Sequence, residues 1–328
     1  MLLQACGNAV RAAREGGDFK AHLQAALEAA PTAAQDDLTR AAHRVVDVAA
    51  ELPPQLGCWF ANLAGALAES GADVDGIPVI ERLSGVSSGA LTFAEAWGPH
   101  VPAAEDGPTP DIYRETQAIL GDRTRIAMQC WYALPQFASA ACTLLSLSPA
   151  TRAAVDDTDE LVDRAAAHCP QLDYVRDLRR VLDGEQLLIL DRTTRQGWGV
   201  EIHGVGDNFQ LHTLLAAVLV PDHLPGRPVD PRHVDAFTTG ESSPMTPIVT
   251  GWWNLVDVNG EWIWNEGVPA DIPLFGDSRV LVLDPPSYER SWSPGRRFPL
   301  MPATLTLTAT YDPADLTAWW PTLKPPAR

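Results

Sequence analysis

Residues 198–220, WGVEIHGVGDNFQLHTLLAAVLV, predict a β-strand that runs through a glycine-containing turn into an apolar helix. Side chains along a strand alternate between its two faces, so Glu201 and His203 share one face. The opposite, apolar face consists of Trp198, Val200 and Ile202. A strand end next to a helix start is a common place for a functional site, and this one gathers several ionisable side chains.

The helix at 209–220 has a clear start and a clear apolar side. Asp207 or Asn208 is expected to cap it, because a short polar side chain there accepts hydrogen bonds from the first free N–H groups. The stripe expected to face the core is Leu211, Leu214, Leu215, Val218 and Leu219.

The rest of the C-terminal half reads as β-structure. Asn259-Gly260 is a strong signal for a two-residue hairpin turn. The run TLTLTAT at 304–310 alternates strictly, which is typical of a half-exposed edge or surface strand. Strands are expected at 186–191, 197–205, 279–283 and 304–310.

The N-terminal half has helical spacing instead. Helices are expected at 2–14, 19–30, 33–51, 54–69, 110–120, 123–147, 157–168 and 171–183, with a less regular stretch at 70–110 that ends in a Pro/Gly-rich surface loop. The expected fold class is therefore α+β, with a helical N-terminal half packed against a β-rich C-terminal half that contains at least one helix. The expected domains are 1–183, all-helical, and 184–328, which carries the candidate site.

The charge of the chain restricts its partners. The 328 residues carry a net charge of -18, which argues against nucleic acid and against anionic membrane surfaces. A small molecule, a peptide or a basic protein is the expected partner. Lysine occurs only as Lys20 and Lys324, which argues against Schiff-base chemistry and, with abundant alanine, suggests a GC-rich bacterial genome.

Cysteine usage and the chain start indicate a cytoplasmic protein. The odd number of cysteines, five, and the absence of a CxxC motif predict buried free thiols in a reducing compartment. The first residues lack the pattern of a secretory signal peptide. The uncharged run at 126–147 contains Pro135 and glutamines, so a buried, kinked helix is expected rather than a membrane span.

The first candidate site is the turn between strand and helix, with Glu201, His203, Asp207 and His212 as catalytic residues. Two imidazoles and a carboxylate can serve as an acid–base pair, or His203 and His212 can ligate a divalent metal. The H-x8-H spacing matches no known metal pattern. Under the competing interpretation, the aspartate only caps the helix and the histidines only hydrogen-bond to neighbouring elements.

The second candidate is an aromatic band of Trp252, Trp253, Trp262 and Trp264 followed by Glu266, which can line a ligand pocket or a partner surface. The alternative for these tryptophans is the core of a β domain.

The third candidate is the pair Arg296 and Arg297, which can clamp a carboxylate or phosphate, or simply form surface ion pairs. The run GVSSG at 85–89 fits a nucleophile motif, but no apolar strand precedes it, so a loop is expected there.

Two functions remain open from the sequence. One is an enzyme that acts on a small molecule or peptide by histidine/carboxylate acid–base or metal-assisted chemistry, such as hydrolysis. The other is a non-catalytic interaction protein, an immunity, regulatory or assembly subunit, that uses its acidic surface and its tryptophan-rich face. The sequence does not decide whether the protein is an enzyme.

Overall fold

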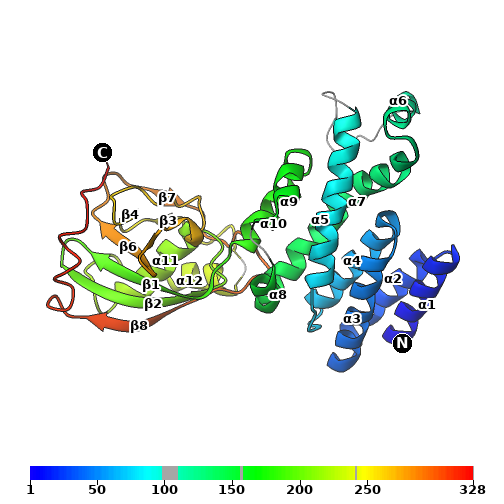
Figure 1. Ribbon diagram of the computed structural model, residues 1–328. Coiled ribbons are helices and arrows are strands. Elements are labelled where there is room, and N and C mark those ends of the chain that lie inside the picture. Colours follow the sequence, from blue (N-terminus) through cyan, green and yellow to red (C-terminus); the bar gives the residue numbers. More distant parts are fainter. Residues whose placement is uncertain (98–109, 156–157, 241, 328) are drawn as a thin grey trace. The chain divides into compact units, whose positions relative to one another are not determined.

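The computed structural model describes residues 1–97, 110–155, 158–240 and 242–327 (Figure 1). The chain divides into two compact units, Met1–Arg179 and Arg180–Arg328. Among the described residues, helices make up the first unit, and a six-stranded mixed sheet, the two-stranded sheet β3-β7 and the α-helices α11 and α12 make up most of the second, so the fold class is α+β as expected.

The N-terminal unit is helical throughout. Its α-helices are α1 (Leu2–Glu15), α2 (Lys20–Ala29), α3 (Gln35–Glu51), α4 (Pro54–Glu69), α5 (Ile77–Trp97), α6 (Pro110–Leu120), α7 (Thr124–Leu147), α8 (Pro149–Ala154), α9 (Glu160–Ala165) and α10 (Gln171–Arg179).

Helix α7 is the central helix of this unit and packs against α4 and α5. It contains Pro135, as the sequence predicts, and buries Trp131 completely. The ring of Trp131 lies 5.9 Å from Phe93 and 6.0 Å from Trp97, both on α5. Among the described residues, no helix combines the length and the apolar character that crossing a bilayer requires.

The expectation of an irregular stretch at 70–110 is wrong over most of these residues, because α5 occupies Ile77–Trp97. Glycine and serine weaken a helical pattern, so the GVSSG run resembles a loop. Within α5, Gly89 allows α7 to approach closely, because a Cβ at this position would overlap Cys130, and Ser87 is fully buried. The Pro/Gly-rich loop falls mostly on residues 98–109, outside the described residues.

The C-terminal unit combines β-strands with two α-helices among the described residues. The helices and strands of this unit are β1 (Asp183–Asp191), β2 (Gln196–His203), α11 (Asn208–Leu219), α12 (Pro231–Thr238), β3 (Val249–Thr250), β4 (Asn254–Val256), β5 (Leu274–Phe275), β6 (Ser278–Asp284), β7 (Ser291–Trp292) and β8 (Thr304–Tyr311).

The strands of the main sheet follow the order β4-β6-β1-β2-β8, and β5 also pairs with β6. Strands β1 and β6 run parallel, with Ile189 opposite Leu281, and the other pairs are antiparallel. Strand β8 lies at one end of this order, so TLTLTAT is the edge strand that its alternation predicts. A turn forms at Asn259-Gly260, where Gly260 has φ 81, but the expected two-residue hairpin turn is wrong. The N–H of Asp257 donates to Glu261 and Val256 pairs with Trp262, so three residues, 258–260, form the loop.

Alternation along the strands gives the sheet two apolar faces. One face packs against α11, where Trp198, Val200 and Ile202 meet Leu211 and Leu215. The other is covered by the C-terminal segment through Leu316 and Leu323. Both faces are therefore buried around β1 and β6, and α11 is fixed over one of them.

Candidate functional site

The start of α11 is fixed by a helix cap and by a neighbouring loop. Asp207 has extended backbone angles, and its Oδ1 accepts a hydrogen bond of 2.8 Å from the backbone N–H of Gln210. The N–H groups of Asn208 and Phe209 donate to the carbonyl oxygens of Gly267 and Asn265, at 2.9 and 3.1 Å. The loop 264–268 therefore supplies acceptors that a helix start otherwise lacks.

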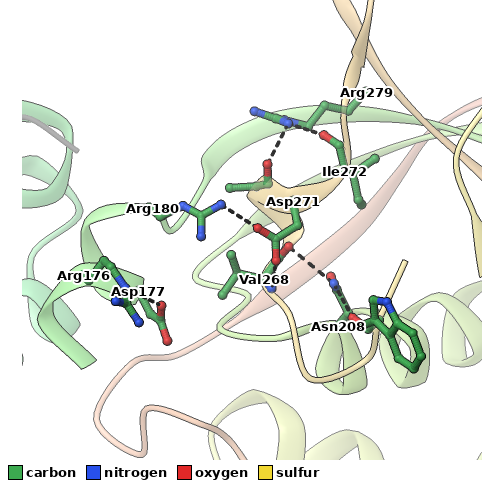
Figure 2. Close-up of polar contacts among 10 residues, drawn as sticks. Arg176, Asp177, Arg180, Asn208, Val268, Asp271, Ile272 and Arg279 are labelled. Carbon is green, nitrogen blue, oxygen red and sulfur yellow. Dashed lines mark hydrogen bonds and ion pairs between the residues drawn. The ribbon is translucent and has the colours of Figure 1, made fainter. Parts of the chain in front are cut away.

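Side chains hold the same loop from both sides, as Figure 2 shows. Asn208 Nδ2 donates to the carbonyl oxygen of Trp264 at 2.9 Å and to that of Val268 at 3.4 Å. Asp271 accepts from the N–H of Val268 at 2.9 Å and forms an ion pair of 2.6 Å with Arg180. These contacts fix the position of the loop relative to α11.

A cavity of about 220 Å³ lies beside this junction. Aromatic rings make up half of its lining side chains, and the ring centroids of Phe209 and Trp292 are 5.3 Å apart. The full lining is Phe209, Trp264, Asn265, Glu266, Tyr288, Arg290, Ser291 and Trp292. An apolar cavity of about 150 Å³ is enough to hold a benzene molecule, so this one has room for a substituted ring.

Two buried polar atoms of the cavity lining have no hydrogen-bond partner among the described residues. They are Nη2 of Arg290 and the indole nitrogen of Trp292. The Asn265 side chain is 2% exposed and hydrogen-bonds to the His212 ring. A buried polar group without a partner costs about 1–3 kcal/mol, and such groups in native proteins usually serve a ligand or an ordered water.

His212 lies behind the cavity and is 1% exposed. Its Nε2 accepts hydrogen bonds from the backbone N–H groups of Trp252 and Trp253, at 3.1 and 3.4 Å. Its ring stacks on Trp253, with centroids 5.7 Å apart, and lies 5.1 Å from Trp292. Burial lowers the pKa of His212 to about 3, although the neighbouring Asn265 side chain acts in the opposite direction.

His203 and Glu201 lie elsewhere. They project from the sheet face opposite the one that packs on α11, and the His203 Nε2 lies 3.0 Å from Glu201 Oε1. Gln186 also donates to the Glu201 carboxylate. The convergence of His203 with His212 expected from the sequence is therefore wrong, because strand alternation and the direction of α11 separate the rings.

The expected metal site fails for the same reason. The Nε2 of His212 already accepts two N–H groups, and the second imidazole is on the other side of the sheet. Within 1–97, 110–155, 158–240 and 242–327, no three His, Cys, Asp or Glu side chains are grouped so that they could hold a metal ion.

Asp207 is the one carboxyl of the first candidate that lies close to the cavity. Burial raises its pKa to about 6, the helix N–H groups and the positive charge of Arg297 oppose this rise, and the negative charge of Glu266 adds to it. Asp207 therefore has a structural role as the cap of α11, and its pKa depends in part on Glu266 of the cavity wall.

The arginine pair does not act as a clamp. Arg296 donates to the carbonyl oxygens of Thr238, Thr239 and Gly240, so its guanidinium caps the C-terminal end of α12. The positive charge of Arg297 instead acts on Asp207 and lowers the pKa of that carboxyl. The two side chains therefore have different partners.

The tryptophan band divides into two pairs. Trp252 and Trp253 enclose His212, and the Trp252 indole donates to the carbonyl oxygen of Arg227 at 2.7 Å. Trp264 is 60% exposed at the cavity, and its centroid lies 5.9 Å from that of Trp262.

Trp264 and Glu266 are thus sequence candidates that the structure brings together. Tyr288, Arg290 and Trp292 were not anticipated. The run SYERSW at 287–292 is the signal that could have suggested them, because two aromatic residues flank an arginine in a loop.

Searches for a matching family model, a similar curated protein and a similar solved structure gave no match.

Proposed function

We propose that the C-terminal unit is a binding module for a compact ligand that carries a ring and polar groups. The cavity beside α11 is the binding site, and it is lined by the side chains named above. The observation that carries the proposal is that Arg290 Nη2 and the Trp292 indole nitrogen, two donors in the cavity lining, have no hydrogen-bond partner among the described residues. A ligand that accepts these hydrogens would offset the cost of burying them.

The site supports binding better than acid–base catalysis by the two histidines. His212 is neutral near pH 7 because burial lowers its pKa to about 3, and His203 lies on the other face of the sheet. The small-molecule partner expected from the sequence fits this site. A bacterial, cytoplasmic protein with such a binding role remains the setting that composition favours.

Ligand-observed NMR on the full chain tests the proposal with benzamide, indole and benzoate as probes. Benzamide combines a ring with a carbonyl oxygen that can accept from the unpaired N–H groups of Arg290 and Trp292. Trp264→Ala removes a largely exposed ring of the cavity wall and is expected to weaken benzamide binding at least tenfold. Trp59→Ala is the matched control, because Trp59 is 43% exposed in the N-terminal unit.

Equal binding of benzamide to the wild type, Trp264→Ala and Trp59→Ala would contradict the proposal. Failure of all three probes to bind the wild type at millimolar concentration would contradict it as well.

A further inference from the structure

Arg290 is an arginine that lacks a carboxylate partner. Its guanidinium carbon lies 4.7 Å from the ring centroid of Trp262 and 4.9 Å from that of Tyr288. No acidic side chain of the described residues lies within 4.0 Å of it, and its buried Nη2 has no hydrogen-bond partner there. Stacking uses the flat faces of a guanidinium and leaves its N–H edge for an anion.

The lack of a partner is notable in this chain. Aspartate and glutamate number 42 against 24 lysines and arginines, so acidic partners for arginine are abundant. In the same unit Arg192 pairs with Asp284 and Arg279 with Glu185, and Arg227 and Arg296 donate to backbone carbonyl oxygens. Arg290 lacks such an oxygen partner among the described residues, and a ligand carboxylate is the acceptor that a guanidinium binds most strongly.

Glu266 places the opposite charge in the same cavity wall. It is exposed, and within the described part of the chain it has no ion-pair partner. Its negative charge does reach Asp207, whose pKa it raises. A cavity of about 220 Å³ thus presents an arginine and a glutamate that do not pair with each other.

The other walls are aromatic, with Phe209, Trp264, Tyr288 and Trp292 around the same space. Aromatic rings in such positions favour a flat ring on the ligand. The net charge of -18 repels a ligand that carries only a negative charge, whereas a zwitterion has no net charge and is not repelled at long range.

We infer that the ligand is a free α-amino acid with an aromatic side chain. Arg290 binds its carboxylate, Glu266 binds its ammonium group, and the ring lies between the aromatic walls. This inference rests on the proposed function, because it specifies the ligand of the same cavity.

Isothermal titration of the full chain with three compounds separates the two charges. The compounds are L-phenylalanine, 3-phenylpropionate, which lacks the ammonium group, and phenethylamine, which lacks the carboxylate. L-Phenylalanine is expected to bind at least tenfold more tightly than either of the others.

Two variants assign each charge to its partner. Arg290→Gln is expected to weaken L-phenylalanine binding at least tenfold and to leave phenethylamine binding within twofold. Glu266→Gln is expected to weaken L-phenylalanine binding at least tenfold without weakening 3-phenylpropionate binding. Arg227→Gln and Glu261→Gln are the matched controls, since Arg227 also stacks on a tryptophan and neither residue lines the cavity.

The outcomes separate this inference from the proposed function. If benzamide binds in a Trp264-dependent manner but L-phenylalanine binds no better than the one-charge compounds, the zwitterion inference is wrong and the binding function stands. If neither benzamide nor L-phenylalanine binds in a Trp264-dependent manner, both are wrong. Because Arg290 also packs on two rings, unchanged far-UV circular dichroism and melting temperature of Arg290→Gln are required before its affinity is interpreted.

Discussion

The Nε2 atom of His212 lies 3.1 Å from the backbone nitrogen of Trp252 and accepts its hydrogen. A nitrogen that accepts a backbone N–H carries no proton, so the neutral ring holds its proton on Nδ1. Burial lowers the pKa of this ring to about 3, which keeps it in that state near pH 7. His212 therefore holds residues 252–253 against α11, and its Nε2 is occupied by these two hydrogen bonds.

The pKa of His212 makes stability depend on pH in a defined direction. The unfolded chain takes up a proton below pH 6.5, whereas the folded ring does so only near pH 3. The contribution of His212 to the free energy of unfolding is therefore complete above pH 6.5 and is lost as the pH falls toward 3. The loss is at most about 1.4 kcal/mol for each pH unit.

His212→Gln keeps an acceptor for the Trp252 N–H and removes the titration, so its free energy of unfolding is expected to fall less steeply between pH 6 and pH 4. Guanidinium unfolding followed by tryptophan fluorescence at each pH measures this slope. A wild-type slope in the variant would show that His212 is not the group responsible.

Asp207 makes stability depend on pH in the opposite direction. Its pKa in the folded chain is raised, mainly by burial, from 3.8 to about 6. Its stabilising contribution is therefore complete below pH 3.8 and is lost as the pH rises through 6. Asp207→Asn keeps a capping oxygen without the charge and is expected to raise the free energy of unfolding at pH 8, by on the order of 1–3 kcal/mol.

Asp207→Ala is the matched variant for Asp207→Asn. It removes the charge as Asp207→Asn does, but also the acceptor for the Gln210 N–H, so it is expected to be about 1 kcal/mol less stable than Asp207→Asn at both pH 4 and pH 8. Denaturant unfolding of the three proteins at the two pH values gives the comparison. If Asp207→Asn were less stable than the wild type at pH 8, the carboxylate charge would be stabilising and the assigned pKa direction would be wrong.

Asn208 connects the helix start to the cavity. It is fully buried, and its amide donates to the carbonyl oxygens of Trp264 and Val268. Asn208→Ala leaves both carbonyls without this donor and is expected to lower the free energy of unfolding by about 1–3 kcal/mol. It is also expected to weaken benzamide binding, because Trp264 and Asn265 lose their support.

Asn62→Ala is the control for Asn208→Ala, since Asn62 is exposed on α4, and it is expected to change stability by less than about 0.5 kcal/mol. Chemical unfolding and benzamide titration on the same preparations measure both effects. Wild-type stability of Asn208→Ala would mean that these hydrogen bonds do not hold the loop.

Local patterns were sufficient to predict the framework of the site. Alternation with a period of two gave the faces of β2, and a short polar residue before an apolar run gave the cap at Asp207. Each signal is contained within a few residues. That is why the strand, the turn and α11 were predictable.

The cavity itself depends on contacts between distant segments, which no local pattern contains. Phe209, Asn265 and Arg290 meet only after the loop 264–268 docks on α11 and β7 pairs with β3. The environment of His212 is similar. Its position on the helix predicted the edge of the core, but its burial depends on the Trp252 and Trp253 segment 40 residues away.

The largest difference from the sequence prediction, α5, can be tested through two glycines of the same run. A Cβ at Gly89 would overlap the Sγ of Cys130 on α7, whereas a Cβ at Gly85 would meet no atom within 4 Å. Gly89→Ala is therefore expected to lower the melting temperature of the N-terminal unit, with a cost of about 1–3 kcal/mol from overpacking. Gly85→Ala is expected to stabilise the helix by about 0.5–1 kcal/mol, because alanine favours a helix more than glycine does.

Cys130→Ala removes the sulfur atom and is expected to reduce the cost of Gly89→Ala when the two are combined, which a double-mutant cycle measures. If 85–89 were instead a loop remote from α7, Gly89→Ala would cost no more than Gly85→Ala and the cycle would show no coupling. Such a result would mean that Gly89 does not lie against Cys130. A close approach of α5 and α7 at Gly89 requires instead that alanine is costly at position 89 and tolerated at position 85.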